Sequence, residues 1–420
     1  MTNRVPPLTL GLGLEHNSRM QINIRHRQTN RHAAIQRRLG AYGQAGGPTL
    51  VVIAGIHGNE PSGVFAFLEL LEELKTAQVE LFGRIVGLAG NLSALQQGVR
   101  FVDRDLNRVW LVTENKSESI DSTNVVPPLN RQPEWRSDPL IIETRERDEL
   151  YQEIRQILAE GQGPHYFIDL HTTSSQSPPF MPFDDTLRNR DFVSKFPVPA
   201  VLGLEEVIPG TLLSYLNEYE VVTFGYEAGQ HDDPQSIILH REMLWCALQF
   251  AGCLPRSCNQ RLEQAIHMLR AHSADLGGCY EVVLRHGLKP NDEFRMDRGF
   301  SSFQPVKVGQ RLAEQNGEVV KAPFSGRMFM PLYQSKGDDG FFLIREIPGF
   351  WLSISRWLRR WRCERWLAWL PGVTVPKHDA RRVLVDPHIA LFLVRQFFHL
   401  LGYRRSGEVD GRLLFVRRDK

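Results

Sequence analysis

A histidine and a glutamate stand three residues apart in Gly-Ile-His-Gly-Asn-Glu, residues 55–60. They follow the apolar run Leu50–Ala54, which predicts a buried strand, and a helical pattern begins soon after them. An imidazole and a carboxylate together suit a divalent metal such as zinc. With one more protein ligand and an open coordination position, this pair would form a hydrolytic metal site.

The third candidate ligand is His171, which a second apolar run, Tyr166–Leu170, would deliver at the carboxyl end of a strand. Two histidines and one carboxylate form a catalytic type of zinc site. We therefore predict that His57, Glu60 and His171 bind one zinc ion per chain. Asp169 lies two residues before His171 and could orient a ligand histidine, because alternate strand positions share a face.

Glu227 is the candidate proton-transfer group. It follows the apolar run Val221–Tyr226 and is flanked by glycines, a position that suits a solvated surface charge poorly. Beside a metal site, such a carboxylate would take a proton from water and pass it to the leaving group.

A basic cluster occupies residues 100–108, Arg-Phe-Val-Asp-Arg-Asp-Leu-Asn-Arg. A guanidinium can stabilise the negative charge that develops on an attacked carbonyl, and its planar fork grips a substrate carboxylate. Arg100, Asn107 and Arg108 could share these tasks. Alternatively, the charged side chains at 103–105 neutralise one another in a salt-bridged loop.

The elements that would position these residues alternate between strand and helix up to about residue 270. Such alternation is typical of an α/β sheet with helices on both faces, whose ligands gather at the carboxyl ends of the strands. Strands are expected at Leu50–Ala54, Arg84–Gly90, Tyr166–Leu170 and Val221–Tyr226, and helices at Val64–Leu74, Asp148–Leu158 and Arg261–Arg270. The polar, proline-bearing stretch 112–139 is expected to be a long loop.

From Cys279 to Ile347 the pattern changes, because short β-prone runs stand between glycines and prolines. This predicts a small all-β domain. The runs are Tyr280–Leu284, Pro305–Val308, Glu318–Lys321, Gly326–Met330 and Gly340–Ile344.

The last segment, 348–420, differs chemically from the rest. Residues 351–420 carry 15 Lys/Arg against 6 Asp/Glu, a net charge of +9, whereas residues 1–350 carry −7. One face of a helical pattern carries Ile354, Trp357, Leu358 and Trp361, and the other directions carry Arg356, Arg359 and Arg360. A Trp/Arg-rich helix of this kind can lie in a membrane interface or pack its tryptophans onto the protein. The basic segment could equally meet an acidic partner or dock on its own acidic body.

Composition excludes several classes of protein. The chain has 420 residues with 42% hydrophobic content, which indicates two or three ordinary folding units. Its five cysteines include no Cys-x-x-Cys pair, so neither a disulfide framework nor a cysteine zinc site is indicated. With no signal segment and no apolar run of about 18 residues, we expect a cytoplasmic protein. No nucleic-acid-binding module is recognisable in the basic segment.

Together these segments resemble the succinylglutamate desuccinylase/aspartoacylase family, which has a zinc carboxypeptidase-like fold. Their order and rough spacing agree with the family over roughly residues 45–345. The matching segments are GIHGNE at 55–60, GN at 90–91, RFVDRDLNR at 100–108, DLHTT at 169–173 and GYEAG at 225–229.

The resemblance implies a mixed sheet flanked by helices, forming a zinc-dependent catalytic domain over residues 1–275. A small β domain at 276–347 would cap the site and narrow its entrance. The resemblance says little about residues 348–420, which we expect to form a basic, Trp/Arg-rich helical extension. Its stretch 351–370 is a candidate contact for a membrane surface or a protein.

Residue roles follow from the resemblance in the same way. His57, Glu60 and His171 would bind zinc. Glu227 would activate water and protonate the departing amine, while Arg100 would polarise the scissile carbonyl. The resemblance also implies that Asn107 and Arg108 bind a carboxylate of the substrate. It implies that Tyr333, from the β domain, enters the substrate pocket.

The expected function is zinc-dependent hydrolysis of the amide bond of an N-acyl amino acid or a related small acylated amine. One departure bears on the substrate: aspartoacylase-like members carry an arginine shortly before the catalytic glutamate, and residues 203–226 contain no Lys or Arg. This argues against N-acetylaspartate. The alternatives are an esterase that uses the same site and a peripheral binding or regulatory protein that acts through its basic tail.

Overall fold

The computed structural model describes residues 21–111, 140–273, 276–334, 337–363, 367, 369–376, 381–386, 398–409, 411–417 and 419. The stretch 112–139, expected to be a long loop, lies outside these residues.

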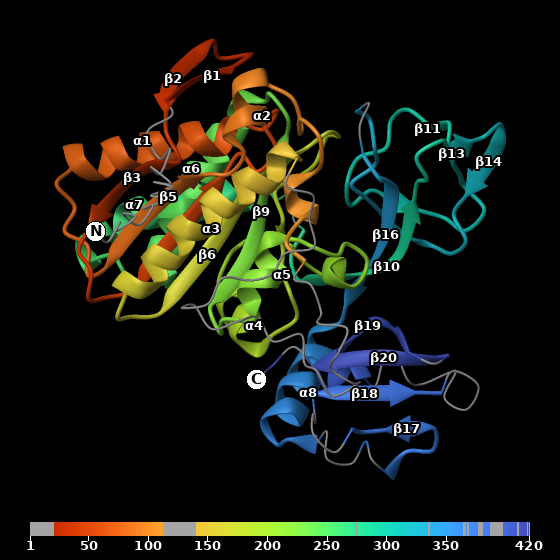
Figure 1. Ribbon diagram of the computed structural model, residues 1–420. Helices are drawn as coiled ribbons and strands as arrows, with labels where there is room; N and C mark the ends of the chain where they lie inside the picture. Colours follow the sequence, from red (N-terminus) through yellow and green to blue (C-terminus); the bar gives the residue numbers. More distant parts are fainter. Residues whose placement is uncertain are drawn as a thin grey trace, which may run out of the picture.

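A five-stranded mixed sheet forms the centre of the molecule (Figure 1). Its strands, in order of hydrogen bonding, are β3 (Arg38–Gly43), β5 (Arg84–Ala89), β4 (Thr49–Ala54), β6 (His165–Thr173) and β9 (Val222–Gln230). Only β3 runs antiparallel to its neighbour, and the other four strands are parallel. All six residues of β4 are buried, as expected for a central strand covered on both faces.

Helices cover both faces of this sheet. They are α1 (Ser62–Thr76), α6 (Pro234–Phe250) and α7 (Asn259–His272) on one face, and α3 (Ile142–Glu160) and α5 (Leu212–Asn217) on the other. Alternate residues of β4 enter the two cores: Leu50 and Val52 pack with α1 and α6, whereas Val51 and Ile53 pack with α3 and α5. The expected α/β architecture is thus present, with the parallel strands ending at one edge of the sheet.

Short elements complete this part of the chain. They are β1 (Ile22–His26), β2 (Arg31–Ile35), α2 (Leu92–Gln97), η1 (Leu106–Arg108), α4 (Leu187–Val193), η2 (Leu204–Glu206) and η3 (Arg256–Cys258). The strands β1 and β2 pair as a hairpin beside α1.

A second, six-stranded sheet has the order β12-β15-β16-β10-β8-β7. Its strands are β7 (Met181–Pro182), β8 (Ala200–Leu202), β10 (Cys279–Gly287), β12 (Pro305–Val306), β15 (Gly326–Phe329) and β16 (Asp339–Ile347). A separate three-stranded sheet consists of β11 (Phe294–Met296), β13 (Arg311–Gln315) and β14 (Glu318–Lys321). Because β7 and β8 precede residue 275, the sheet runs across the boundary expected from the sequence. The β-rich segment is therefore built onto the α/β part by shared strands.

The tail corrects the expectation of a helical extension. Among the tail residues that the structure describes, α8 (Gly349–Arg360) and residues 398–400 are helical, and four strands form an antiparallel sheet. The strands are β17 (Val373–Thr374), β18 (Arg382–Val385), β20 (Arg412–Arg417) and β19 (Tyr403–Val409). Alternate residues such as Val383 and Val385 enter a small core with Tyr403 and Phe415.

In the part of the chain that is described, no helix combines the length and the apolar content needed to cross a membrane.

Candidate active site

His57 and Glu60 lie on the tight turn that joins β4 to α1. Gly55 has a φ of +72°, in the left-handed region that glycine adopts most easily. A Cβ on Gly58 would lie 2.0 Å from the carbonyl carbon of Ala94 in α2, so only glycine fits there. The backbone nitrogen of Glu60 donates to the carbonyl of His57 at 3.1 Å and closes the turn. The two glycines thus let this turn place both side chains at the end of β4.

His171 and Glu227 come from the two neighbouring parallel strands. His171 of β6 lies directly opposite Glu227 of β9 in the register, and a bulge follows both residues. The side chains of both residues are buried. Since β4, β6 and β9 run parallel, their carboxyl ends bring the turn, the histidine and the glutamate to one edge of the sheet.

The three candidate ligands form one cluster. Nδ1 of His57 lies 2.9 Å from Oε1 of Glu60, and Nδ1 of His171 lies 3.3 Å from Oε2. One ligand atom from each residue can be chosen so that all lie within 4.8 Å of one another. Atoms bound to a tetrahedral zinc ion at about 2.0–2.2 Å lie roughly 3.3–3.6 Å apart, so the set fits a zinc-sized ion with little rearrangement.

Each histidine has a carboxylate behind it. Nε2 of His57 lies 3.2 Å from Oδ1 of Asp105, and Nε2 of His171 lies 2.8 Å from Oδ2 of Asp169. In metal sites such a carboxylate fixes the ring and its tautomer and raises the basicity of the other nitrogen. Both Nδ1 atoms are therefore oriented toward Glu60 as ligands would be. Asp169 was expected from the sequence, whereas Asp105 was considered only as a member of a self-neutralising loop.

Charges around the cluster keep Glu60 ionised. Burial would raise the pKa of Glu60, but His57 and His171 outweigh burial and hold it well below its ordinary value. The backbone nitrogen of Thr172 also donates to Oε2 of Glu60 at 2.8 Å. Burial would likewise lower the pKa of His171, but Asp169 and Glu60 raise it well above its ordinary value. The same negative charge that attracts this proton favours any cation at the cluster, because a metal and a proton compete for the nitrogen.

Glu227 differs from Glu60 in its proton affinity. Its burial, aided by the negative charge of Glu60, raises its pKa to about 8. Its Oε2 atom has no hydrogen-bond partner among the residues described. The backbone of Glu227 is held by a reciprocal pair of hydrogen bonds with Phe180, at 3.0 and 3.1 Å, and by the pairing with β6. A carboxyl group that titrates near neutrality on a fixed backbone can both accept and return a proton.

Arg100 faces the cluster from the loop after α2. Its Nη1 lies 3.5 Å from Oε1 of Glu60, and its Nη2 donates to Oδ2 of Asp105 at 3.2 Å. Burial would lower the pKa of Arg100, but Asp105 and Glu60 raise it, so the guanidinium stays charged. Glu143 of α3, which the sequence did not single out, accepts from the backbone nitrogens of Val102 and Arg104 at 2.8 and 3.0 Å and so holds this loop.

A pocket of about 100 Å³ opens beside these residues. Its wall is shared between the α/β part and the β-rich segment, and it includes Arg100, Asp105, Arg108, Thr172, His231, Leu332, Gln334 and Asp339. Nη2 of Arg108 lies 3.8 Å from Oδ2 of Asp339, the first residue of β16. The sequence did not identify Asp339, because nothing in the chain near it indicates that β16 reaches the site.

Two predicted substrate residues do not line this pocket. Asn107 accepts a hydrogen bond from the backbone nitrogen of Leu212 at 2.9 Å, so its side-chain oxygen holds the start of α5. The hydroxyl of Tyr333 donates to the carbonyl of Asp297 at 2.7 Å within the β-rich segment. The structure thus brings the predicted ligands, Glu227, Arg100 and Arg108 together, whereas the side chains of Asn107 and Tyr333 hydrogen-bond to the protein backbone.

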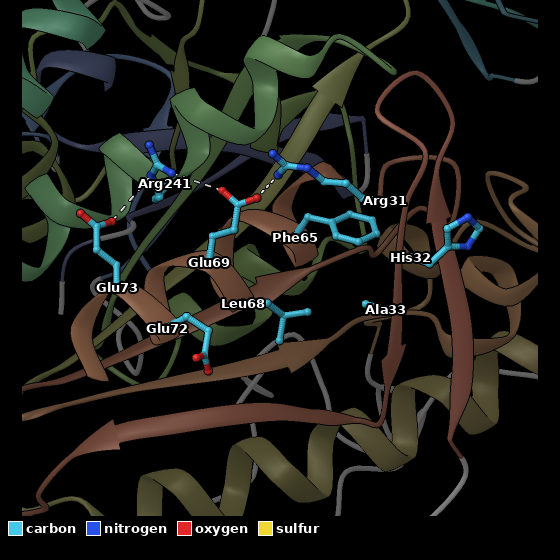
Figure 2. Close-up of a pocket in the computed structure, with 9 residues that line it drawn as sticks. All are labelled: Arg31, His32, Ala33, Phe65, Leu68, Glu69, Glu72, Glu73 and Arg241. Atoms are coloured by element: carbon cyan, nitrogen blue, oxygen red, sulfur yellow. Dashed lines mark hydrogen bonds and ion pairs between the residues drawn. The ribbon is translucent and has the colours of Figure 1, made fainter. Parts of the chain in front are cut away.

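A wider hollow of about 600 Å³ lies elsewhere, between the β1–β2 hairpin, α1 and α6. Figure 2 shows that its charged side chains face one another: Glu69 pairs with both Arg31 and Arg241, and Arg241 also reaches Glu73. Among the residues described, the group of His57, Glu60 and His171 is the one set of three that could hold a metal ion. The hollow therefore lacks the chemistry of the smaller pocket.

Comparisons with known proteins agree with this geometry. A family model described as the succinylglutamate desuccinylase/aspartoacylase catalytic domain matches residues 46–241. A succinylglutamate desuccinylase from Pseudomonas paraeruginosa is 36% identical over 64 residues, which are 15% of this chain and 19% of the relative. The match thus spans about a fifth of that curated relative.

Solved structures match over a longer stretch. A succinylglutamate desuccinylase/aspartoacylase from Rhodobacter sphaeroides superposes with a TM-score of 0.51 at 16% identity, covering 78% of this chain and 94% of that one. The ectoine utilization protein EutE (DoeB) from Ruegeria pomeroyi, in a product-bound structure, gives a TM-score of 0.50 at 17% identity with the same coverage. These likenesses show a shared fold. Residues 46–241, whose motifs lie at one edge of the central sheet, thus match the catalytic domain of the succinylglutamate desuccinylase/aspartoacylase family.

Proposed function

We propose that the protein is a zinc-dependent hydrolase that cleaves the amide bond of a small N-acylated amino acid or a related acylated amine. The observation that carries this proposal is the buried cluster of His57, Glu60 and His171 next to a glutamate whose pKa is about 8. The match to the family and the names of the relatives support a deacylase over other hydrolases.

His57, Glu60 and His171 would hold the metal, with Asp105 and Asp169 fixing the two imidazoles. Bound there, zinc would supply a Lewis acid that polarises the substrate carbonyl and lowers the pKa of water. Glu60 enters this set already ionised, as a ligand must be.

Glu227 would move the proton. As its carboxylate, it accepts a proton from the water that attacks the amide carbon, and as its acid form it gives that proton to the departing amine nitrogen. Burial raises the pKa of Glu227 to about 8 without a metal ion, and the charge of a bound cation would lower it toward neutrality, where both protonation states are accessible.

Arg100 would stabilise the negative charge that develops on the carbonyl oxygen. Asp105 keeps the guanidinium charged and aimed at the cluster. Arg108, on the wall of the small pocket, would pair with a substrate carboxylate, and this requires it to exchange the neighbouring Asp339 for the substrate. A pocket of about 100 Å³ holds a few water-sized groups, so a small substrate is expected.

Replacing the proton carrier tests this proposal. Glu227→Gln removes proton transfer but leaves the metal ligands in place, so turnover should fall by about 10²–10⁴-fold with unchanged zinc content. The measurement is hydrolysis of a panel of N-acyl amino acids by zinc-loaded protein, with metal content determined by elemental analysis.

Glu72→Gln is the matched control, because Glu72 is an exposed glutamate on α1 far from the cluster. Wild-type turnover by the Glu227 variant, or no hydrolysis of any amide in the panel, would contradict the proposal. Hydrolysis of matched esters alone would identify an esterase that uses the same residues.

A further inference from the structure

The helix α8 is docked with its polar side inward. Its buried residues are Ser355 and Arg359, and Leu352 and Leu358 are partly buried against the cores, whereas its aromatic side chains and Ile354 are exposed. The exposed fractions are 56% for Phe350, 42% for Trp351, 39% for Ile354, 53% for Trp357 and 70% for Trp361. A surface helix of a globular protein normally buries its large apolar side chains, so the exposed aromatic face of α8 is unusual. The alternative in which its tryptophans pack onto the protein is not realised.

Buried polar contacts fix this orientation. Arg359 donates to Oδ2 of Asp185 at 2.7 Å, and both side chains are buried. The hydroxyl of Ser355 accepts from Arg190 at 3.1 Å and donates to the carbonyl of Leu400 at 2.7 Å. Rolling the helix to hide its tryptophans would leave Asp185 with a buried charge that has lost one partner, which is strongly unfavourable. The outward apolar face is therefore a stable feature of the fold.

The exposed aromatic rings form a ridge. Trp357 and Trp361 stack with their centroids 5.4 Å apart, and Phe350 and Trp351 lie 4.7 Å apart. With Ile354 between the two pairs, the ridge runs along the whole helix, a length of roughly 18 Å. A contiguous exposed apolar surface of this kind marks a binding site on most proteins.

Arginines border the ridge. The side chain of Arg360 is 65% exposed, Arg356 is exposed and pairs with Asp191 at 2.9 Å, and Arg362 is exposed at the end of the helix. A second copy that packed its α8 in parallel against this face would bring these arginines toward their own counterparts. Anionic lipid headgroups instead complement them, while tryptophan rings favour the boundary between headgroups and acyl chains.

We propose that the exposed face of α8 binds the surface of an anionic lipid membrane, with the helix lying flat and its aromatic ridge inserted among the headgroups. In an ordinary interfacial helix the polar face contacts water. In α8 the polar face, with Ser355 and Arg359, contacts the rest of the protein instead. This inference does not depend on the proposed hydrolase activity.

Vesicle flotation with the full chain tests the tryptophans. Wild-type protein should bind vesicles of phosphatidylcholine and phosphatidylglycerol in a 3:1 ratio, with a blue shift of tryptophan emission, and should bind pure phosphatidylcholine much less. The double variant Trp357→Ser/Trp361→Ser should bind the anionic vesicles at least about tenfold more weakly. Phe82→Ser, which removes a 63% exposed aromatic side chain far from α8, should bind like wild type.

A charge reversal tests the arginines. Arg360→Glu should weaken binding to the anionic vesicles about tenfold or more at low salt, and added salt should reduce that difference. Arg295→Glu is the matched control, because Arg295 is 78% exposed on the β-rich segment. Unchanged melting temperatures would show that all variants fold.

Three results would overturn the proposal. They are no binding of wild-type protein to anionic vesicles, equal binding by the wild type and the double tryptophan variant, and equal binding to neutral and anionic vesicles. A concentration-dependent dimer in sedimentation equilibrium that the double variant loses, without vesicle binding, would assign the ridge to a second copy of the chain.

Discussion

At the scale of single residues, the site depends on carboxylates placed behind the histidines that face Glu60. Asp105 and Asp169 hold Nε2 of His57 and His171 while the Nδ1 atoms converge. The three candidate ligands could be predicted from the sequence because each follows an apolar run that delivers it to the same edge. Asp105 could not, because its role depends on a contact across 48 residues of chain.

The carboxylate behind His171 has a measurable role. Asp169→Asn should weaken zinc binding by about 10–100-fold, because the neutral amide no longer raises the basicity of the imidazole or fixes its tautomer. Competition with a chromogenic chelator measures the affinity directly, without reference to activity. Glu72→Gln should leave the affinity unchanged, and an Asp169 variant with wild-type affinity would show that the carboxylate has no influence on the cluster.

At the scale of elements, turns and short strands do more positioning than the long helices. The helices α1 and α7 and the buried strands of the central sheet were predicted within a few residues, because their apolar pattern is regular. The long helix α6 was not predicted, since most of its residues are buried and no clear polar face marks its periodicity. The strands β7 and β8 were not, since two or three residues carry too little pattern to recognise. The amphipathic pattern of α8 was visible in the sequence, but the side it buries is decided by Asp185, which lies far away in the chain.

The turn between β4 and α1 is sensitive to a single methyl group. Gly58→Ala would place a Cβ 2.0 Å from a backbone carbon of α2, which cannot move aside as a flexible side chain would. We expect a loss of about 1–3 kcal/mol in the free energy of unfolding, together with weaker metal binding. Urea denaturation followed by tryptophan fluorescence measures the loss. Gly349→Ala, at a position with no atom within 4 Å, should cost little, and equal stability of the two variants would contradict the explanation.

At the scale of the whole molecule, the opposite charges of the body and the tail meet in one buried cluster. Asp185, which is fully buried, accepts hydrogen bonds from Arg190 of α4, Arg359 of α8 and Arg404 of β19. Figure 1 shows the tail beside α4, where these contacts lie. The charge difference between the segments was visible in the sequence, and docking on the acidic body was one expected outcome. The partners could not be predicted, since buried arginines and surface arginines look alike in a sequence.

This cluster predicts how stability depends on pH. Burial would raise the pKa of Asp185, but the three arginines outweigh burial and hold it well below its ordinary value. The unfolded chain therefore binds a proton at a higher pH than the folded chain. The stabilisation is present above the unfolded pKa of about 3.9 and is lost as the pH falls toward the folded value.

Thermal unfolding between pH 7 and pH 3 measures this dependence. The melting temperature of wild-type protein should fall steeply below about pH 4. Asp185→Asn should be less stable at pH 7, because three arginines lose a buried counter-charge, and its stability should change less with acid. Parallel curves for the two proteins would contradict the assignment.

Phe180 forms reciprocal backbone hydrogen bonds with Glu227, and Asp185 follows Phe180 by only five residues. The buried charge cluster is therefore close in the chain to a residue that holds the candidate active site. A version of the chain that ended before α8 would keep this acid group and lose two of its three cations. The extension thus neutralises a buried charge of the α/β part and stabilises it. We therefore expect a relative without α8 and β19 to have an uncharged residue at this position or to supply positive charge from another element.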